Sequence, residues 1–128
     1  MLVESYYQQI EHEISICPYI VETKLRFDKR ALHIAYIEGS IGFIDGSVLH
    51  FIEFIDTKEQ VDRYKYSFHY QDKKNKLIFR YDMAPHHKSI ISFPHHKHEK
   101  SEDNVISADP PIFSDILVEI VQTIENDA

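Results

Sequence analysis

The sequence predicts an α+β fold: an antiparallel sheet of five to six strands, with an N-terminal and a C-terminal helix packed on one face of that sheet. Three observations predict this class. Apolar residues recur with helical spacing only towards the two ends of the chain. Between residues 20 and 82 that spacing gives way to short runs in which apolar and polar residues alternate. The length of 128 residues, with 43% hydrophobic residues, indicates one domain spanning residues 1–128 around one core.

The first expected element is a helix over residues 1–16. Its apolar residues recur at steps of three and four, which places them on one face: Val3, Tyr7, Ile10 and Ile14. Pro18 ends this helix, because proline has no backbone N–H with which to continue the hydrogen-bond ladder.

The last expected element is a second helix that starts at Asp109-Pro110-Pro111, with proline in the first turn, where its missing N–H costs nothing. One continuous apolar face of this helix is formed by Phe113, Ile116, Leu117, Ile120, Val121 and Ile124. Residues 99–108, just before it, are mostly polar and are expected to form a mobile loop.

Between the helices, five strands are expected, at residues 22–27, 32–37, 47–55, 63–71 and 76–82. Gly39, Gly42 and Gly46 are expected to mark turns, and Asp45-Gly46 is the strongest turn signal in the chain. The histidine-rich stretch at 84–98 is expected to add two short extended pieces separated by a loop.

The fourth strand has the clearest alternation. One set of its side chains is aromatic, namely Tyr64, Tyr66, Phe68 and Tyr70. The other set is polar or basic, namely Arg63, Lys65, Ser67 and His69. Successive side chains of a strand point to opposite faces. We therefore expect the aromatic set to be buried under the helices and the polar set to lie on the opposite face, where the working surface would be.

The composition excludes several classes of protein. No stretch approaches the roughly 18 apolar residues that a membrane span needs, so no membrane association is expected. The first residues lack the basic region and apolar run of a secretory signal. Cys17 is the only cysteine and cannot form an internal disulfide, as is typical of proteins in a reducing compartment. The sequence therefore predicts a cytoplasmic protein.

The charge is unevenly distributed. The net charge is −7, which taken alone argues against a nucleic-acid partner. Residues 63–100, however, carry nine Lys or Arg against three Asp or Glu. The segments before and after are acidic. A basic, histidine-rich centre between acidic flanks indicates a local positive field suited to a polyanion.

Five of the nine histidines lie between His86 and His98. Histidine is the usual residue for proton transfer at neutral pH and a common ligand of transition metals. His96 and His98 are two residues apart, so in a strand they share a face. A zinc site would need three or four converging ligands. If a metal is bound, its ligands would come from His86, His96 and His98, with His87 or Asp82 as further candidates.

A second interpretation needs no metal. Cleavage of RNA through its own 2′-hydroxyl requires a base, an acid and a cation that stabilises the phosphorane. Candidates for the catalytic and orienting roles are His69, Arg80, Asp82, His86, His95, His96 and His98. Candidates for binding the phosphates are Arg63, Lys65, Arg80 and Lys97. Asp82 would orient a histidine or Arg80. His12, His33 and His50 stand apart in the sequence and are given no role.

Several segments together resemble the TumE toxin family over about residues 5–125. They are Asp45-Gly46-Ser47, residues 64–70, Phe79-Arg80-Tyr81-Asp82 and the Pro-His-His pairs at residues 85–87 and 94–96. Met83 stands where the family pattern leads us to expect asparagine. The resemblance implies the toxin of a type II toxin–antitoxin pair that acts on RNA and is held by a helix-turn-helix antitoxin.

The sequence therefore predicts an RNA-directed toxin, a ribonuclease that uses no cofactor. Two alternatives stay open. The chain can be a non-catalytic binding module in which the same surface only docks a partner protein, and the histidine segment can be merely a solvated loop. The chain can also be a phosphoesterase that depends on a divalent metal ion. A homodimer is a further open alternative for its assembly.

Overall fold

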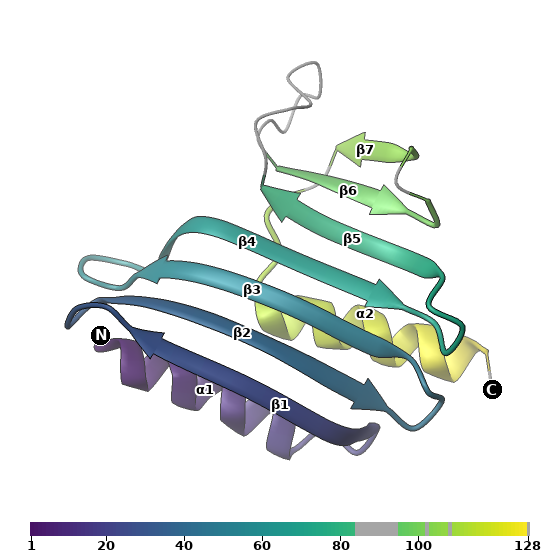
Figure 1. Cartoon of the computed structure of the whole chain (residues 1–128), viewed down its shortest axis with the longest axis horizontal. Helices are drawn as coiled ribbons and strands as arrows, with labels where there is room; N and C mark the ends of the chain where they lie inside the picture. Colours follow the sequence, from purple (N-terminus) through teal and green to yellow (C-terminus); the bar gives the residue numbers. More distant parts are fainter. Residues whose placement is uncertain (84–94, 102, 108, 128) are drawn as a thin grey trace.

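The computed structural model describes residues 1–83, 95–101, 103–107 and 109–127. The elements in chain order are α1 (Val3–Ser15), β1 (Ile20–Lys29), β2 (Ile34–Phe43), β3 (Val48–Asp56), β4 (Asp62–Gln71), β5 (Leu77–Met83), β6 (His95–Glu99), β7 (Val105–Ser107) and α2 (Phe113–Asn126). The described strands form one antiparallel sheet whose spatial order follows the chain from β1 to β7 (Figure 1). The predicted α+β class is confirmed, and the three-residue β7 adds an edge within the segment expected to be a loop.

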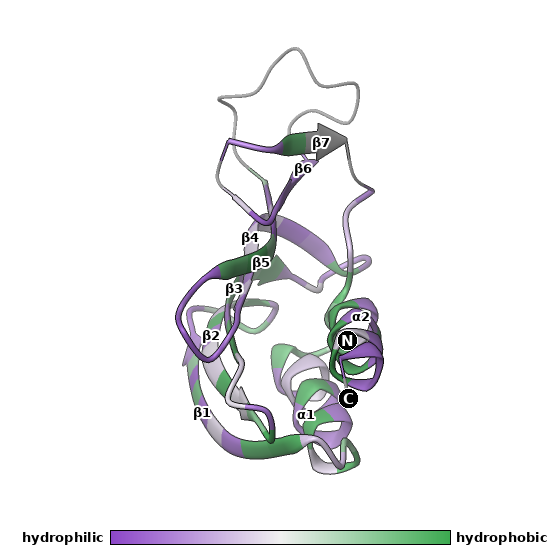
Figure 2. Ribbon diagram, turned by 90° about the vertical axis from the view of Figure 1, so that its right-hand side faces the viewer, coloured by the Kyte–Doolittle hydropathy of each residue, from purple (hydrophilic) through white to green (hydrophobic). Residues whose placement is uncertain are grey.

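Both helices lie against the same side of the sheet (Figure 2). We call this side the inner face and the opposite side the outer face. The core lies between the helices and the inner face, and its largest fully buried side chains include Tyr66, Tyr70, Phe43, Phe51, Phe68 and Phe79. Phe51 of β3 meets Phe113 of α2 with ring centroids 5.0 Å apart. The outer face is therefore the side on which polar side chains can gather. No helix among the described residues is long and apolar enough to cross a membrane.

The second helix starts later than the prolines suggest. Ile112 is extended and caps α2, whose first helical residue is Phe113. The backbone N–H of Ile112 donates to Asp115 Oδ2 at 3.1 Å, so Asp115 satisfies a group that the helix itself leaves unbonded. The two prolines precede the helix instead of lying in its first turn, and Pro111 is buried.

Two predicted turns at glycine are wrong. Gly39 and Gly42 lie inside β2, and among the described glycines only Gly46 has a positive φ, at 86°. Gly46 forms the turn between β2 and β3, as predicted. Gly39 is needed for space, because a Cβ there would lie 2.4 Å from Phe51 Cε1 and 2.7 Å from Leu25 Cδ2.

Replacing Gly39 with alanine should lower the free energy of unfolding by about 1–3 kcal/mol, since the Phe51 and Leu25 side chains must move out of well-packed positions. Urea unfolding would measure the change. Gly42→Ala is the matched control, because its Cβ would come only to 3.4 Å from Glu22 Cβ. Equal stabilities of the two variants would contradict the steric account.

A β-bulge alters the expected alternation of β4. Tyr66, Phe68 and Tyr70 are buried on the inner face, as predicted. Phe54 pairs with Lys65 but the next residue, Ile55, pairs with Arg63, so Tyr64 is the extra residue. The faces predicted for residues 63 and 64 are therefore wrong. Tyr64 lies on the outer face and is 52% exposed, and Arg63 points inward. A bulge re-aims side chains in this way because two residues oppose one on the partner strand.

Candidate functional site

A row of polar side chains crosses the outer face on neighbouring strands. His50 of β3 pairs with His69 of β4, His69 with Arg80 of β5, and Arg80 with His98 of β6. The imidazole rings of His50 and His69 have centroids 6.4 Å apart. His50 is exposed and His69 half-buried. Antiparallel pairing thus places two imidazoles and a guanidinium side by side from segments far apart in the sequence.

A buried cluster lies at one end of this row, where β5 and β6 pair. Asp82 is 6% exposed, His96 1% and His98 4%. His96 Nε2 contacts Asp82 Oδ1, and His98 Nε2 lies 3.9 Å from Asp82 Oδ2. Arg80 Nε lies 3.0 Å from the same Oδ2. The Asp82 carboxylate therefore links the buried imidazoles to the guanidinium of Arg80, whose side chain is 35% exposed.

A groove of about 550 Å³ runs over the outer face of the central strands. The charged and imidazole side chains that line it are Lys24, Arg26, Glu38, His50, His69 and Arg80. Three cations thus face one carboxylate, and Arg26 Nη1 lies 3.1 Å from that carboxylate, on Glu38. The groove is locally positive in a chain of net charge −7, and this suits an anionic ligand.

The cluster offers two kinds of chemistry. Its three possible ligand atoms, one each from Asp82, His96 and His98, lie within 4.8 Å of one another. Imidazole nitrogen and carboxylate oxygen are suitable ligands for a divalent transition-metal ion. Without a metal, a carboxylate that accepts a hydrogen bond from an imidazole fixes the orientation of that ring, and through Oδ2 it also fixes a guanidinium.

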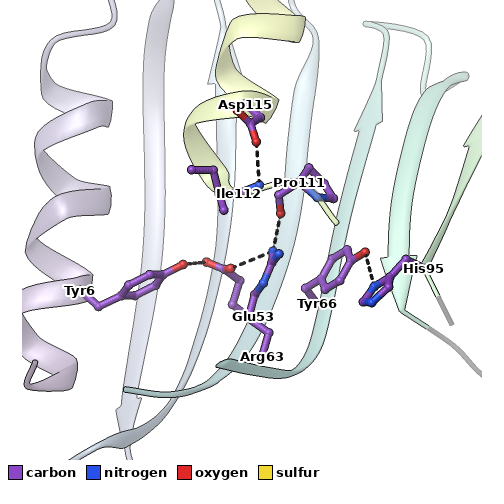
Figure 3. A network of polar contacts seen from close by, with 8 residues as sticks. All are labelled: Tyr6, Glu53, Arg63, Tyr66, His95, Pro111, Ile112 and Asp115. Atoms are coloured by element: carbon purple, nitrogen blue, oxygen red, sulfur yellow. Dashed lines mark hydrogen bonds and ion pairs between the residues drawn. The ribbon is translucent and has the colours of Figure 1, made fainter. Parts of the chain in front are cut away.

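Arg63 belongs to a separate, buried network on the inner face (Figure 3). Its Nη1 lies 3.5 Å from Glu53 Oε2 and donates to the carbonyl oxygen of Pro111. The hydroxyl of Tyr6 on α1 donates to Glu53 Oε1 at 2.8 Å. Glu53 is fully buried, and this burial raises the pKa of its carboxyl group. Arg63 thus lies apart from the outer groove, contrary to the placement expected from the sequence.

The network continues to β6 (Figure 3). The Arg63 guanidinium lies 4.3 Å from the ring centroid of Tyr66, and the Tyr66 hydroxyl is 2.9 Å from His95 Nδ1. Burial, together with the charge of Arg63, lowers the pKa of His95. Burial raises the pKa of Tyr66 to about 12, so its hydroxyl keeps its proton at neutral pH.

The lowered pKa of His95 predicts a loss of stability on mild acidification. The unfolded chain protonates His95 at a higher pH than the folded chain does. The contribution of neutral His95 to the free energy of unfolding is therefore complete above the unfolded pKa of about 6.5, and it is lost as pH drops towards the folded pKa. His95→Phe keeps a ring beside Tyr66 but cannot titrate. Urea unfolding at pH 7.5 and 5.5 should show a smaller pH dependence for this variant than for the wild type; equal pH dependence would contradict the prediction.

The remaining predicted site residues divide between the two faces. Lys97 lies on the inner face, where its Nζ is 3.1 Å from Glu119 Oε2 of α2 and 4.9 Å from the ring centroid of Tyr81. Lys65 is exposed on the outer face beside Phe54. His86 lies outside the described residues. The structure therefore separates Arg63 and Lys97 from the outer groove.

The predicted residues that do come together are His69, Arg80, Asp82, His96 and His98. Sequence analysis missed His50, which belongs to the same row. The set of alternate β3 residues that contains His50 is otherwise apolar, so the pattern does not show which face of β3 is exposed. That set is Val48, His50, Ile52 and Phe54. The available signal was the other alternate set of β3, in which Leu49, Phe51 and Ile55 are apolar, because His50 must lie on the face opposite to theirs.

Comparison with protein families identifies the chain over nearly its whole length. The family model described as toxin TumE matches residues 9–126, nearly the whole chain. No curated protein matches the chain, and no solved structure does so either. The resemblance read from the sequence motifs is thus confirmed, and it implies an antitoxin as partner. The chain belongs to the TumE family of toxins.

Proposed function

We propose that this toxin is an endoribonuclease that cleaves RNA in the outer groove. One observation carries the proposal: the His50 and His69 rings lie 6.4 Å apart in a positively charged groove, with Arg80 next in the same row. Two imidazoles can supply the acid and the base, and the guanidinium can supply the fixed positive charge.

The reaction is a transesterification at phosphorus. The 2′-oxygen of a ribose attacks the adjacent phosphorus, and one imidazole takes the proton of that hydroxyl. The new bond joins O2′ to phosphorus, and the bond from phosphorus to O5′ breaks. The second imidazole, protonated, donates its proton to O5′. The products are a 2′,3′-cyclic phosphate and a 5′-hydroxyl, and no other reactant is consumed.

Arg80 would stabilise the negative charge that develops on the phosphorane, because a guanidinium supplies a fixed positive charge and several N–H donors. The Asp82 carboxylate fixes the position of this guanidinium, because Asp82 Oδ2 lies 3.0 Å from Arg80 Nε. Asp82 is in turn held by its contact with His96. We therefore assign His50, His69 and Arg80 as catalytic residues. Asp82, His96 and His98, all buried, are positioning residues that act through Arg80.

The second candidate function is a metal-dependent phosphoesterase. It is favoured by the convergence of Asp82, His96 and His98, whose ligand atoms lie within 4.8 Å of one another. A bound divalent ion would polarise a phosphoryl oxygen or activate a water molecule. Ion pairing of Asp82 with Arg80 and the two imidazoles accounts for the same contacts without a metal ion, so we prefer the two-imidazole mechanism.

The test begins with the purified protein and an RNA oligonucleotide labelled at both ends. We expect cleavage that survives chelator and yields 2′,3′-cyclic phosphate ends. Loss of cleavage with chelator, and its return with one divalent ion, would support the metal-dependent alternative instead. No cleavage by folded protein would overturn the ribonuclease proposal.

A test in cells addresses the partner. Expression of the toxin alone should slow growth, and coexpression of a helix-turn-helix antitoxin from the neighbouring gene should restore it. Unimpaired growth, with folded protein present, would instead favour a module that only binds another protein.

A further inference from the structure

Three aromatic side chains gather on the outer face, beyond the groove. Tyr36 of β2 and Phe54 of β3 have ring centroids 6.0 Å apart, and Phe54 and Tyr64 of β4 have centroids 5.3 Å apart. We call these three residues the aromatic platform. Because both helices cover the inner face, the platform is no part of the core between the sheet and the helices.

The bulge in β4 creates the platform. Without the extra residue, Tyr64 would follow the inward alternation of Tyr66 and Phe68, but it lies outside and is 52% exposed. Its hydroxyl donates to Asp56 Oδ2 at 2.9 Å, which fixes the ring at 72° to that of Phe54. An exposed ring held in place by a hydrogen bond loses little freedom when a ligand stacks on it.

The platform lies within reach of the proposed catalytic row. Phe54 and His50 are four residues apart on the same face of β3, which corresponds to about 13 Å along the strand. Lys65, which pairs with Phe54, adds an exposed cation beside the platform. A few nucleotides of an extended RNA strand span this separation, with phosphates over the cations and bases over the rings.

The carboxylates near the platform are already occupied. Asp56 accepts from the Tyr64 hydroxyl and, through Oδ1, from the Lys58 backbone N–H at 2.9 Å. Glu38, on the groove side, is paired with Arg26. Asp62, which pairs with Asp56, accepts from Gln60 Nε2 at 2.9 Å. A nucleic-acid strand on this path therefore meets exposed cations and ring faces, and the neighbouring carboxylates accept hydrogen bonds from the protein's own donors.

We propose that the aromatic platform stacks unpaired bases next to the cleaved phosphate, so that the substrate of this toxin is single-stranded RNA. This inference rests on the proposed ribonuclease function and adds the substrate class. Base faces are accessible to aromatic side chains in single strands and are covered by neighbouring base pairs in a duplex.

The experiment measures binding without cleavage. A fluorescent hexanucleotide with 2′-O-methyl riboses lacks the attacking hydroxyl but keeps its bases, and anisotropy reports its affinity for wild-type protein. Phe54→Leu and Tyr64→Leu should each weaken binding at least about fivefold, since stacking on one base is worth that much or more. A hexamer of the same backbone without bases should bind these variants and the wild type alike.

Tyr19→Leu is the matched control. Tyr19 also donates its hydroxyl to a carboxylate, Glu125 Oε2, at 2.8 Å, but it contacts α2 instead of the platform. This variant should bind the hexamer like the wild type. A loss as large as that of Tyr64→Leu would overturn the stacking proposal.

The outcomes separate the two proposals. If wild-type protein cleaves RNA but Phe54→Leu and Tyr64→Leu bind the hexamer unchanged, the platform proposal fails and the ribonuclease stands. If those two variants weaken capture of the antitoxin but not of the hexamer, the platform is an antitoxin surface and the proposal is overturned. If wild-type protein neither binds the hexamer nor cleaves RNA, the ribonuclease proposal itself fails.

Discussion

Replacing His69 or His50 with alanine should lower the rate of RNA cleavage by about two to four orders of magnitude, which is the usual contribution of a general acid or base. Each imidazole serves one proton transfer, so the wild-type rate should be bell-shaped in pH. Each variant should lose one limb of that profile. The measurement is single-turnover cleavage of an RNA oligonucleotide between pH 5 and 9.

The control variants lie elsewhere. His12 is exposed on α1, against the inner face, and His12→Ala should cleave like the wild type.

His96→Ala and His98→Ala should cost more activity than His12→Ala or His33→Ala, because they loosen the contacts that hold Arg80. Their pH profiles should keep both limbs. Equal rates for all these variants, in folded protein, would show that this row is not the site.

Replacing Arg63 with leucine should lower the free energy of unfolding by about 3–5 kcal/mol, the usual cost of removing one partner of a buried ion pair. The variant leaves the Glu53 carboxyl fully buried, hydrogen-bonded to the Tyr6 hydroxyl but without its guanidinium partner, and it removes the Arg63 donor from the carbonyl of Pro111. Urea unfolding at pH 7 would measure the loss.

Arg26→Leu is the matched control for this variant. Arg26 also pairs with a glutamate, Glu38, but its side chain is 63% exposed, so its loss should cost less than about 1 kcal/mol. Glu53→Leu combined with Arg63→Leu should regain much of the stability, because no unpaired charge is left in the core. An Arg63→Leu protein as stable as the wild type would contradict this account of the network.

The fold was predictable where periodicity is strong. Helical spacing gave both helices, and alternation gave the five long strands and the inward placement of Tyr66, Phe68 and Tyr70. The bulge was not predictable, because residues 63–70 alternate without interruption in the sequence. The register shifts in the pairing with β3, and this shift brings Arg63 to the buried carboxylate of Glu53.

The candidate site was predictable in part for a similar reason. His96 and His98 are two residues apart, and this spacing suggested a shared face; Asp82 was a candidate because it precedes the histidine segment. His50 joins them only through the pairing of β3 with β4, which no local pattern specifies. Lys97 shows the opposite case: it lies between His96 and His98, so strand geometry sends it to the inner face, and Glu119 of α2 is there to pair with it.

The order of the sheet, in which each strand pairs with its neighbours in the chain, has a consequence for folding. Such a meander is built from local hairpins and has few long loops to close, which favours rapid assembly. Part of its inner face, however, stays uncovered until α2 supplies Phe113, Ile116 and Ile120 to the core, because α1 covers only the rest. During synthesis the sheet can therefore form early, but its packed state must wait until residues 113–126 have left the ribosome. The proposed catalytic row would thus be translated in full before the chain can reach its packed state.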